Sequence, residues 1–181
     1  MRSASPIKIS LQIEPAYRKL IERRQLRAAA RLAVQRPLNL IPRPLRVSLK
    51  GEGEPALELT IVITGDDQIQ ALNRQYRQVD APTDVLAFAA TEAAGAQGSD
   101  AFVDASVEAV YLGDIVISYP RAEAQAQAGG HPPGAELQLL IVHGVLHLLG
   151  YEHATPAQKR AMWAVQAEIM QAIGAPITGP T

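Results

Sequence analysis

The 181-residue chain contains no cysteine. This absence excludes disulfide bonds and disulfide-linked partners, thiolate nucleophiles, iron–sulfur clusters and every zinc site built on cysteine. A transition-metal site would have to use histidine, aspartate or glutamate, and the chain has only four histidines. The length fits one domain whose hydrophobic core needs no covalent support.

Long apolar runs are also absent. No segment reaches the roughly 18 consecutive apolar residues that a membrane-spanning helix needs. The most apolar stretch, residues 137–149, is interrupted by two histidines and a glutamine. The N-terminus lacks the apolar core of a secretory signal. We therefore expect a cytoplasmic protein with no membrane partner.

The formal net charge of −1 hides a strong asymmetry along the chain. Residues 1–50 carry 12 Lys and Arg against two Glu, whereas residues 51–181 carry five basic and 16 acidic side chains. A basic N-terminal segment followed by an acidic remainder is typical of proteins that bind a polyanion or a membrane surface, and of these two partners we expect the polyanion.

Hydrophobic periodicity and turn residues divide the chain into short elements. Strands are predicted at residues 7–13, 45–50, 57–64, 83–90 (a buried strand) and 111–118, and helices at about 15–34, 67–76, 120–129, 133–149 and 156–173. They do not alternate strictly, which indicates the α+β class. We expect a single domain over residues 1–181, with a basic strand–helix segment at about 1–44 and a small, acidic insertion loop at about 91–109.

Three of the four histidines, His143, His147 and His153, lie within the eleven residues HGVLHLLGYEH. The first two are four positions apart on a predicted helix, so both imidazoles lie on the same face. Gly150 can end the helix and turn the chain, which brings His153 toward the same point. Three neutral imidazoles with an open fourth position are typical of a catalytic zinc site, and we predict one ion per chain.

The spacing matches the metzincin pattern H-E-x-x-H-x-x-G-x-x-H with one departure. Gly144 stands where peptidases have the glutamate that acts as general base, so peptide hydrolysis by that route lacks its base. Gly144 also leaves more room for a substrate. Glu152 is the one carboxylate within the motif. It either orients a ligand or handles a proton, or it is a solvated turn residue or a salt-bridge partner.

A second cluster lies in LNRQYRQVDAPTDVLAF, residues 72–88. Arg77 has a planar guanidinium suited to bidentate binding of a phosphate, although a surface salt bridge, perhaps with Asp80, is the alternative. Asn73 falls one turn before Arg77 and shares its face or caps a turn. Asp84 is expected to be a polar residue of a turn or strand start, and it could also accept a hydrogen bond from a metal-bound histidine. Two further polar residues are Asp114, which pairs with backbone or lines a cleft, and His131, a loop residue.

HGVLHLLGYEH resembles the H-G-x-L-H-L-x-G-Y-D-H signature of the bacterial YbeY-type endoribonucleases that mature ribosomal RNA. Residues 72–88 resemble the second block of that family, and LGDIVIS, residues 112–118, resembles the third. The similarity covers about residues 57–173, together with a plausible first strand and helix. Glu152 stands where the family usually has Asp, and Ala87 where it often has Ser.

The resemblance implies a small α+β domain with a mixed sheet of about four strands flanked by helices and a zincin-like metal site on the central helix and the turn after it. It further implies a zinc-dependent, single-strand-specific endoribonuclease that matures the 3′ end of 16S rRNA and acts in late ribosome quality control, with the small ribosomal subunit as partner. The zinc ligands would be His143, His147 and His153, and Arg77 would be the arginine of the cleft.

The expected chemistry is phosphodiester hydrolysis by a metal-activated water, with Arg77 holding the phosphate. The basic first helix, with Arg23, Arg24 and Arg27, either attracts RNA over a distance or presents an ordinary solvated face. Two alternatives remain open from the residues: a metzincin-like metallopeptidase, and a non-catalytic ribosome-assembly factor whose fold zinc stabilises.

Overall fold

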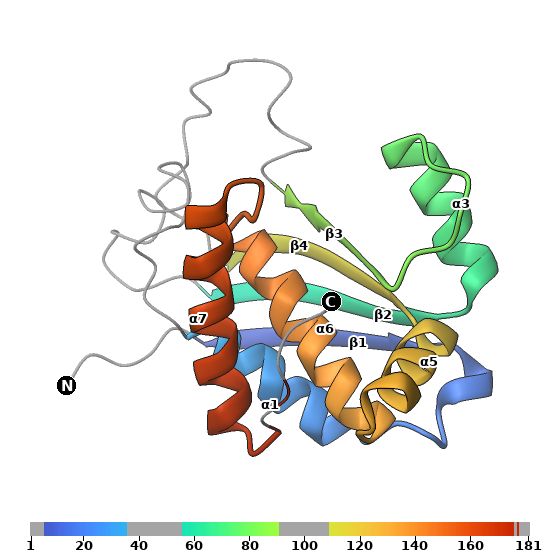
Figure 1. Ribbon diagram of the computed structural model, residues 1–181, viewed down its shortest axis with the longest axis horizontal. Coiled ribbons are helices and arrows are strands. Elements are labelled where there is room, and N and C mark those ends of the chain that lie inside the picture. The colour runs from blue at the N-terminus through green and yellow to red at the C-terminus, as the bar shows by residue number, and fades with distance from the viewer. Residues whose placement is uncertain (1–5, 36–55, 91–108, 176, 178–181) are drawn as a thin grey trace.

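A four-stranded mixed sheet organises the fold of the computed structural model (Figure 1). The structure describes residues 6–35, 56–90, 109–175 and 177. Its elements are β1 (Ile7–Ile13), the 3-10 helix η1 (Pro15–Tyr17), α1 (Arg23–Val34), β2 (Ala56–Thr64), α3 (Asp66–Arg77), β3 (Val85–Ala89), β4 (Ala109–Ser118), α5 (Tyr119–Gly129), α6 (Pro133–Leu148) and α7 (Pro156–Ala172). The α+β class is confirmed. The expected strand at 45–50 and nearly all of the expected loop at 91–109 lie outside the described residues.

The strands lie in the order β1-β2-β4-β3. β1, β2 and β4 run parallel, and β3 pairs antiparallel with β4. Residues alternate strictly between the two faces of β2, where Leu57, Leu59 and Ile61 are buried and their neighbours are half-buried. The prediction of a buried strand at 83–90 is partly wrong, because β3 is a five-residue edge strand in which only Leu86 is fully buried.

Helices α1, α5, α6 and α7 cover one face of the sheet, and α3 packs on the other (Figure 1). The core between the sheet and the four helices contains most of the buried apolar side chains. Helix α6 is central, since twelve of its sixteen residues are buried. Across the described residues, none of the helices has both the length and the apolarity to cross a lipid bilayer.

The predicted helix at 15–34 is split in two. Residues 15–17 form a 3-10 turn, and the α-helix begins only at Arg23. Contacts at the end of β1 explain the break: the Tyr17 ring stacks on Tyr119 with centroids 4.7 Å apart, and the Arg18 Nε donates to the Ile13 carbonyl oxygen over 3.1 Å. The chain therefore turns before it enters α1. In this turn Ile21 is buried in the core.

Candidate metal centre and pocket

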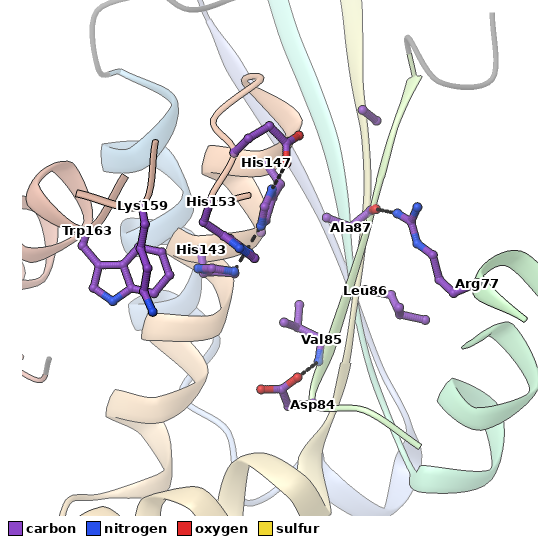
Figure 2. A pocket seen from close by; sticks show the side chains of 13 residues that line it. Arg77, Asp84, Val85, Leu86, Ala87, His143, His147, His153, Lys159 and Trp163 are labelled. Atoms are coloured by element: carbon purple, nitrogen blue, oxygen red, sulfur yellow. Dashed lines mark hydrogen bonds and ion pairs between the residues drawn. The ribbon is translucent and has the colours of Figure 1, made fainter. Parts of the chain in front are cut away.

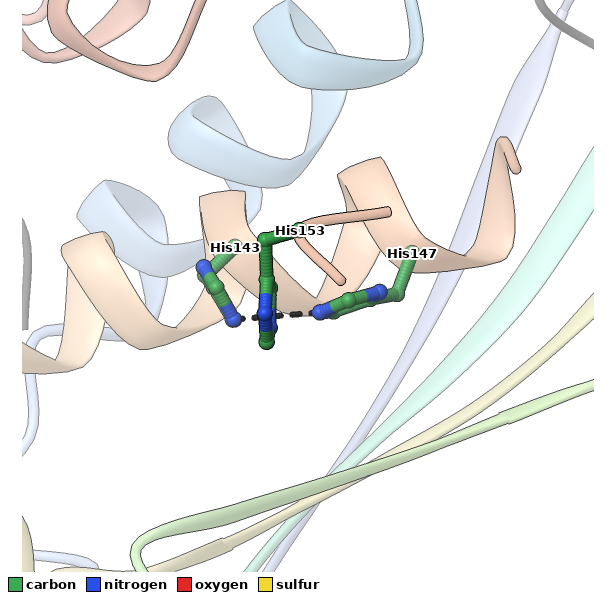
Figure 3. Close-up of side chains that lie close together, drawn as sticks. All are labelled: His143, His147 and His153. Carbon is green, nitrogen blue, oxygen red and sulfur yellow. Dashed lines mark hydrogen bonds between the residues drawn. The ribbon is translucent and has the colours of Figure 1, made fainter. Parts of the chain in front are cut away.

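The three histidines of the central motif lie together in space (Figure 3). Each offers one ring nitrogen, and these nitrogens all lie within 4.8 Å of one another. The Nε2 atoms of His143 and His147 are 3.1 Å apart. Tetrahedral zinc with bonds of about 2.0–2.1 Å would separate its ligand nitrogens by about 3.3 Å. The cluster therefore fits a small transition-metal ion.

The end of α6 explains how His153 reaches the other two. Gly150 has a φ of 86°, a left-handed conformation that a glycine adopts without strain. The Tyr151 N–H donates to the Leu146 carbonyl over 3.0 Å, and the Gly150 N–H donates to the His147 carbonyl over 2.9 Å. These two bonds form a Schellman motif, which closes the helix and reverses the chain.

Gln166 on α7 fixes the orientation of His143. The Gln166 Oε1 lies 3.1 Å from His143 Nδ1, and both side chains are buried. Because a carbonyl oxygen can only accept, Nδ1 carries the proton and Nε2 presents its lone pair to the cluster. This is the arrangement by which an outer acceptor commonly holds a metal-binding histidine.

Burial keeps the two helical histidines neutral. Burial, reinforced by repulsion from His147, lowers the pKa of His143 to about 4. Burial also lowers the pKa of His147, with His153 as the next contribution. Both imidazoles are therefore neutral at neutral pH, each with one ring nitrogen free of a proton, which is the state that binds a metal.

The histidines open into a pocket of about 670 Å³ between α6, α7 and β3 (Figure 2). Arg77 and Lys159 both line it, and Figure 2 shows them on opposite sides of the histidines. The Arg77 Nη2 donates to the Ala87 carbonyl oxygen over 3.3 Å, which ties its guanidinium to β3. The structure thus brings Arg77, which the sequence places 66 residues before His143, to the same pocket as the three histidines.

Glu152 also lines the pocket, but its side chain is more than half exposed. Its Oε2 lies 3.9 Å from His147 Nδ1, which is too long for a hydrogen bond and close enough for an electrostatic interaction. A catalytic role for Glu152 therefore stays a prediction.

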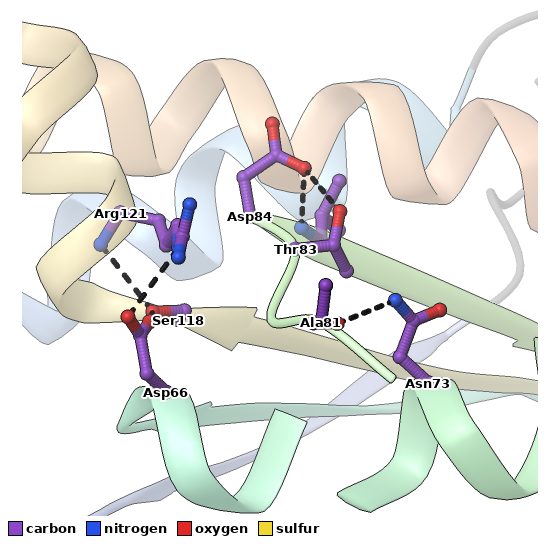
Figure 4. Close-up of polar contacts among 8 residues, drawn as sticks. Asp66, Asn73, Ala81, Thr83, Asp84, Ser118 and Arg121 are labelled. Carbon is purple, nitrogen blue, oxygen red and sulfur yellow. Dashed lines mark hydrogen bonds and ion pairs between the residues drawn. The ribbon is translucent and has the colours of Figure 1, made fainter. Parts of the chain in front are cut away.

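Asp84 and Asn73 hold the loop before β3 (Figure 4). The Asp84 Oδ1 accepts from the Val85 N–H over 2.8 Å and from the Thr83 hydroxyl, and its Oδ2 accepts from Gln125 over 3.0 Å. The Asn73 amide donates to the Ala81 carbonyl over 2.7 Å. Asp84 is thus the polar residue of a strand start that the sequence suggests, and it lines the pocket, but the acceptor for His143 is Gln166 rather than Asp84.

Two other polar residues lie apart from the cluster. Asp114 accepts from the Tyr111 hydroxyl over 2.7 Å, a partner different from the backbone or cleft that the sequence suggested. His131 is more than a loop residue, because its Nε2 lies 3.1 Å from the buried Glu136 carboxylate. Burial raises the pKa of Glu136, and the neighbouring His131 opposes that rise.

Gly144 lets α6 approach the sheet closely. A Cβ built at this position would lie 2.8 Å from Cγ2 of Ile115, a fully buried residue on β4. Gly144 lines the pocket, yet its missing side chain would point at the sheet. A glutamate at this position would have to displace Ile115, so packing accounts for the absence of the peptidase base.

Three site residues on α7 were not predicted: Gln166, Lys159 and Trp163. A signal for Gln166 was present in the sequence, because it interrupts the apolar stripe of Met162 and Ile169 on one face of the helix. A polar residue in a buried stripe needs a buried partner. The positions of Lys159 and Trp163 carry no such signal.

Comparisons with known proteins show what this chain is similar to. A protein-family model described as "Endoribonuclease YbeY" matches residues 22–174. The Endoribonuclease YbeY of Dehalococcoides mccartyi strain CBDB1 is 38% identical over 170 residues, which cover 92% of this chain and 93% of that protein. The Endoribonuclease YbeY of Chloroflexus aurantiacus is 48% identical over 140 residues, covering 76% and 87%. The solution structure of TM1509 from Thermotoga maritima overlaps with a TM-score of 0.46 at 20% identity, covering 96% and 97%.

Proposed function

The chain belongs to the YbeY endoribonuclease family, and we propose that it is a zinc-dependent endoribonuclease that hydrolyses phosphodiester bonds in single-stranded RNA. The observation that carries the proposal is the three-histidine cluster in a pocket with Arg77 on one side and Lys159 on the other. Imidazole nitrogens suit zinc, and cations suit the phosphates of RNA.

In this proposal the residues of the pocket have separate roles in binding the metal, the phosphate and the proton. His143, His147 and His153 would hold the ion, and Gln166 keeps His143 in the tautomer that binds it. A bound divalent ion supplies Lewis-acid chemistry, which polarises a phosphoryl oxygen and acidifies water. Arg77 donates hydrogen bonds to the phosphate and stabilises the charge that develops on it during hydrolysis. Glu152, whose carboxylate lies 3.9 Å from His147, would take up a proton in this proposal.

The substrate we propose is the 16S rRNA precursor, cleaved during maturation of its 3′ end. The same activity would serve late quality control of the small ribosomal subunit, and both roles belong in the cytoplasm. Membership of the family supports this assignment.

The structure gives no support to a metallopeptidase, because the general base of that mechanism has no space at position 144. A non-catalytic assembly factor differs from an enzyme in one measurable way. Its zinc would stabilise the fold, and Arg77 would be dispensable.

The decisive experiment measures zinc content and cleavage of single-stranded RNA for the wild type, His147→Ala and Arg77→Ala. His147→Ala should lose zinc and activity together. Arg77→Ala should keep zinc and lose activity by about 10²–10³-fold, the usual loss when one donor to a developing negative charge is removed. Arg74→Ala is the matched control, because Arg74 is an exposed arginine of the same helix that pairs with Asp80.

Arg74→Ala should cleave RNA at the wild-type rate. If Arg77→Ala also retains wild-type cleavage and rRNA processing while it still binds zinc, the proposed role of Arg77 is wrong. That result would favour the non-catalytic assembly factor. Cleavage of a peptide library but not of single-stranded RNA by the zinc-loaded wild type would reject the endoribonuclease altogether.

A further inference from the structure

Lys159 and Trp163 form a pair on the pocket wall opposite Arg77 (Figure 2). They are four positions apart on α7 and so lie on one face of the helix. The Lys159 Nζ lies 4.9 Å from the centroid of the Trp163 ring, which is the geometry of a cation–π contact. Lys159 is exposed, so its ammonium is within reach of solvent and ligand.

Trp163 is itself held by the histidine cluster. Its ring meets His153 at 82° with centroids 5.6 Å apart and meets His143 at 81° with centroids 6.1 Å apart. These contacts, together with half-burial of the side chain, fix the ring relative to the metal-binding residues. A flexible lysine side chain resting on a fixed ring has fewer positions to sample and places its charge near the cluster.

The pocket therefore has two cationic groups with the histidines between them. Successive phosphates repeat along an RNA strand, so a strand that places its scissile phosphate at the histidines needs a site for a neighbouring phosphate. Arg77 belongs to α3 and is tied to β3, whereas Lys159 belongs to α7. The two cations lie on different walls, and one strand crossing the pocket could contact both.

We propose that Lys159 binds the RNA phosphate next to the scissile one, and that Trp163 is the positioning residue that holds Lys159 for this contact. The proposal rests on the proposed function, since it assumes that RNA enters this pocket. It assigns to α7 a part of the substrate-binding surface that the histidine motif and Arg77 do not supply.

The first test replaces Lys159 by glutamine and measures cleavage of single-stranded RNA at several salt concentrations. Each phosphate contact adds about 0.7 to the slope of log affinity against log salt for single strands. Lys159→Gln should therefore raise KM at low salt and leave kcat nearly unchanged. A fourfold rise in salt should raise KM about 2.6-fold less in the variant than in the wild type.

Arg160→Gln is the matched control. Arg160 is the next residue on α7, is exposed, and is not among the described residues that line the pocket. It loses the same charge, so any general effect of net charge on RNA affinity appears in both variants. An equal change in KM and salt slope for the two variants would overturn the proposal.

The second test asks whether Trp163 acts through Lys159. Trp163→Leu removes the ring and should raise KM as Lys159→Gln does, whereas Trp163→Phe keeps a ring face and should retain most of the affinity. In a Lys159→Gln background, Trp163→Leu should have no further effect on KM, because the group it positions is gone. An equal increase in KM in both backgrounds would refute the positioning role.

Zinc content measured for every variant separates binding from folding. A variant that holds one zinc per chain has kept the cluster, and its KM then reports on RNA alone. If the wild type cleaves RNA and Lys159→Gln leaves both KM and the salt slope unchanged, the proposed phosphate site at Lys159 is refuted, whereas the proposed function is not. If the zinc-loaded wild type cleaves no RNA, the proposed function fails first.

Discussion

Gln166 offers the sharpest test of the metal centre, because a single side-chain hydrogen bond joins it to His143 of the cluster. Its Oε1 accepts from His143 Nδ1 over 3.1 Å, and 2% of the residue is exposed. Replacing it by leucine keeps the approximate volume and removes the acceptor. The His143 N–H is then left unpaired in a site where only 7% of the histidine is exposed. Water cannot easily replace the lost partner.

The size of the effect follows from that burial. Leaving a buried donor unpaired costs about 1–3 kcal/mol, and loss of the outer partner of a metal-binding histidine typically lowers metal affinity 10–100-fold. The two ranges agree, since each tenfold change is about 1.4 kcal/mol. We expect Gln166→Leu to weaken zinc binding by 10–100-fold. Gln166→Glu keeps an acceptor and adds a negative charge, so it should bind zinc at least as tightly as the wild type.

Competition with a chromogenic chelator measures the zinc affinity of each variant directly. Gln171→Leu is the control, because it makes the same chemical change at an exposed position of the same helix. It should leave the affinity unchanged. Gln166→Leu protein that folds normally and binds zinc as tightly as the wild type would refute the claim that Gln166 orients His143.

Two further predictions concern packing and charge. Gly144→Ala should destabilise the metal-free protein in urea unfolding by about 1–3 kcal/mol relative to Gly134→Ala, because the new Cβ at position 144 lies 2.8 Å from Ile115, whereas the one at position 134 meets its nearest atom at 3.6 Å; equal stabilities would show that α6 can move off the sheet at no cost. Three exposed arginines lie at the start of α1: Arg23, Arg24 and Arg27. Neutralising them should weaken RNA binding and flatten its salt dependence, and an unchanged salt slope would contradict their role in attracting RNA.

The histidine cluster was predictable because its information is local. A four-residue spacing puts His143 and His147 on one face of any helix, and Gly150 supplies the left-handed residue that ends it. The Schellman motif then reverses the chain, so that His153, three residues after Gly150, comes close to the other two histidines. Each step depends on backbone geometry that a few neighbouring residues determine.

The opposite walls of the pocket were not predictable in this way. Arg77 reaches the cluster because β3 pairs antiparallel with β4 at the edge of the sheet, and the order β1-β2-β4-β3 leaves no mark in the sequence. Lys159 and Trp163 reach it because α7 packs back along α6. Such contacts join residues that are distant in sequence, and the same amphipathic pattern allows several packings.

The break between η1 and α1 illustrates the same limit within a single element. Residues 15–34 contain helix-forming residues and suitable spacing, so local propensity favours one helix. Tyr17 instead stacks on Tyr119, more than 100 residues away in sequence. Tertiary contacts override a local preference worth only tenths of a kcal/mol per residue.

The charges that line the pocket determine how strongly it attracts an RNA phosphate. Its described lining has two cationic side chains, Arg77 and Lys159, and two carboxylates, Asp84 and Glu152. These charges cancel, so the lining by itself gives an RNA phosphate little net attraction. His143 and His147, whose pKa values are lowered, add no charge at neutral pH, and a divalent ion held by the cluster would make the pocket positive. The same ion that supplies the chemistry would therefore also provide much of the short-range attraction for RNA, in a part of the chain that is acidic as a whole.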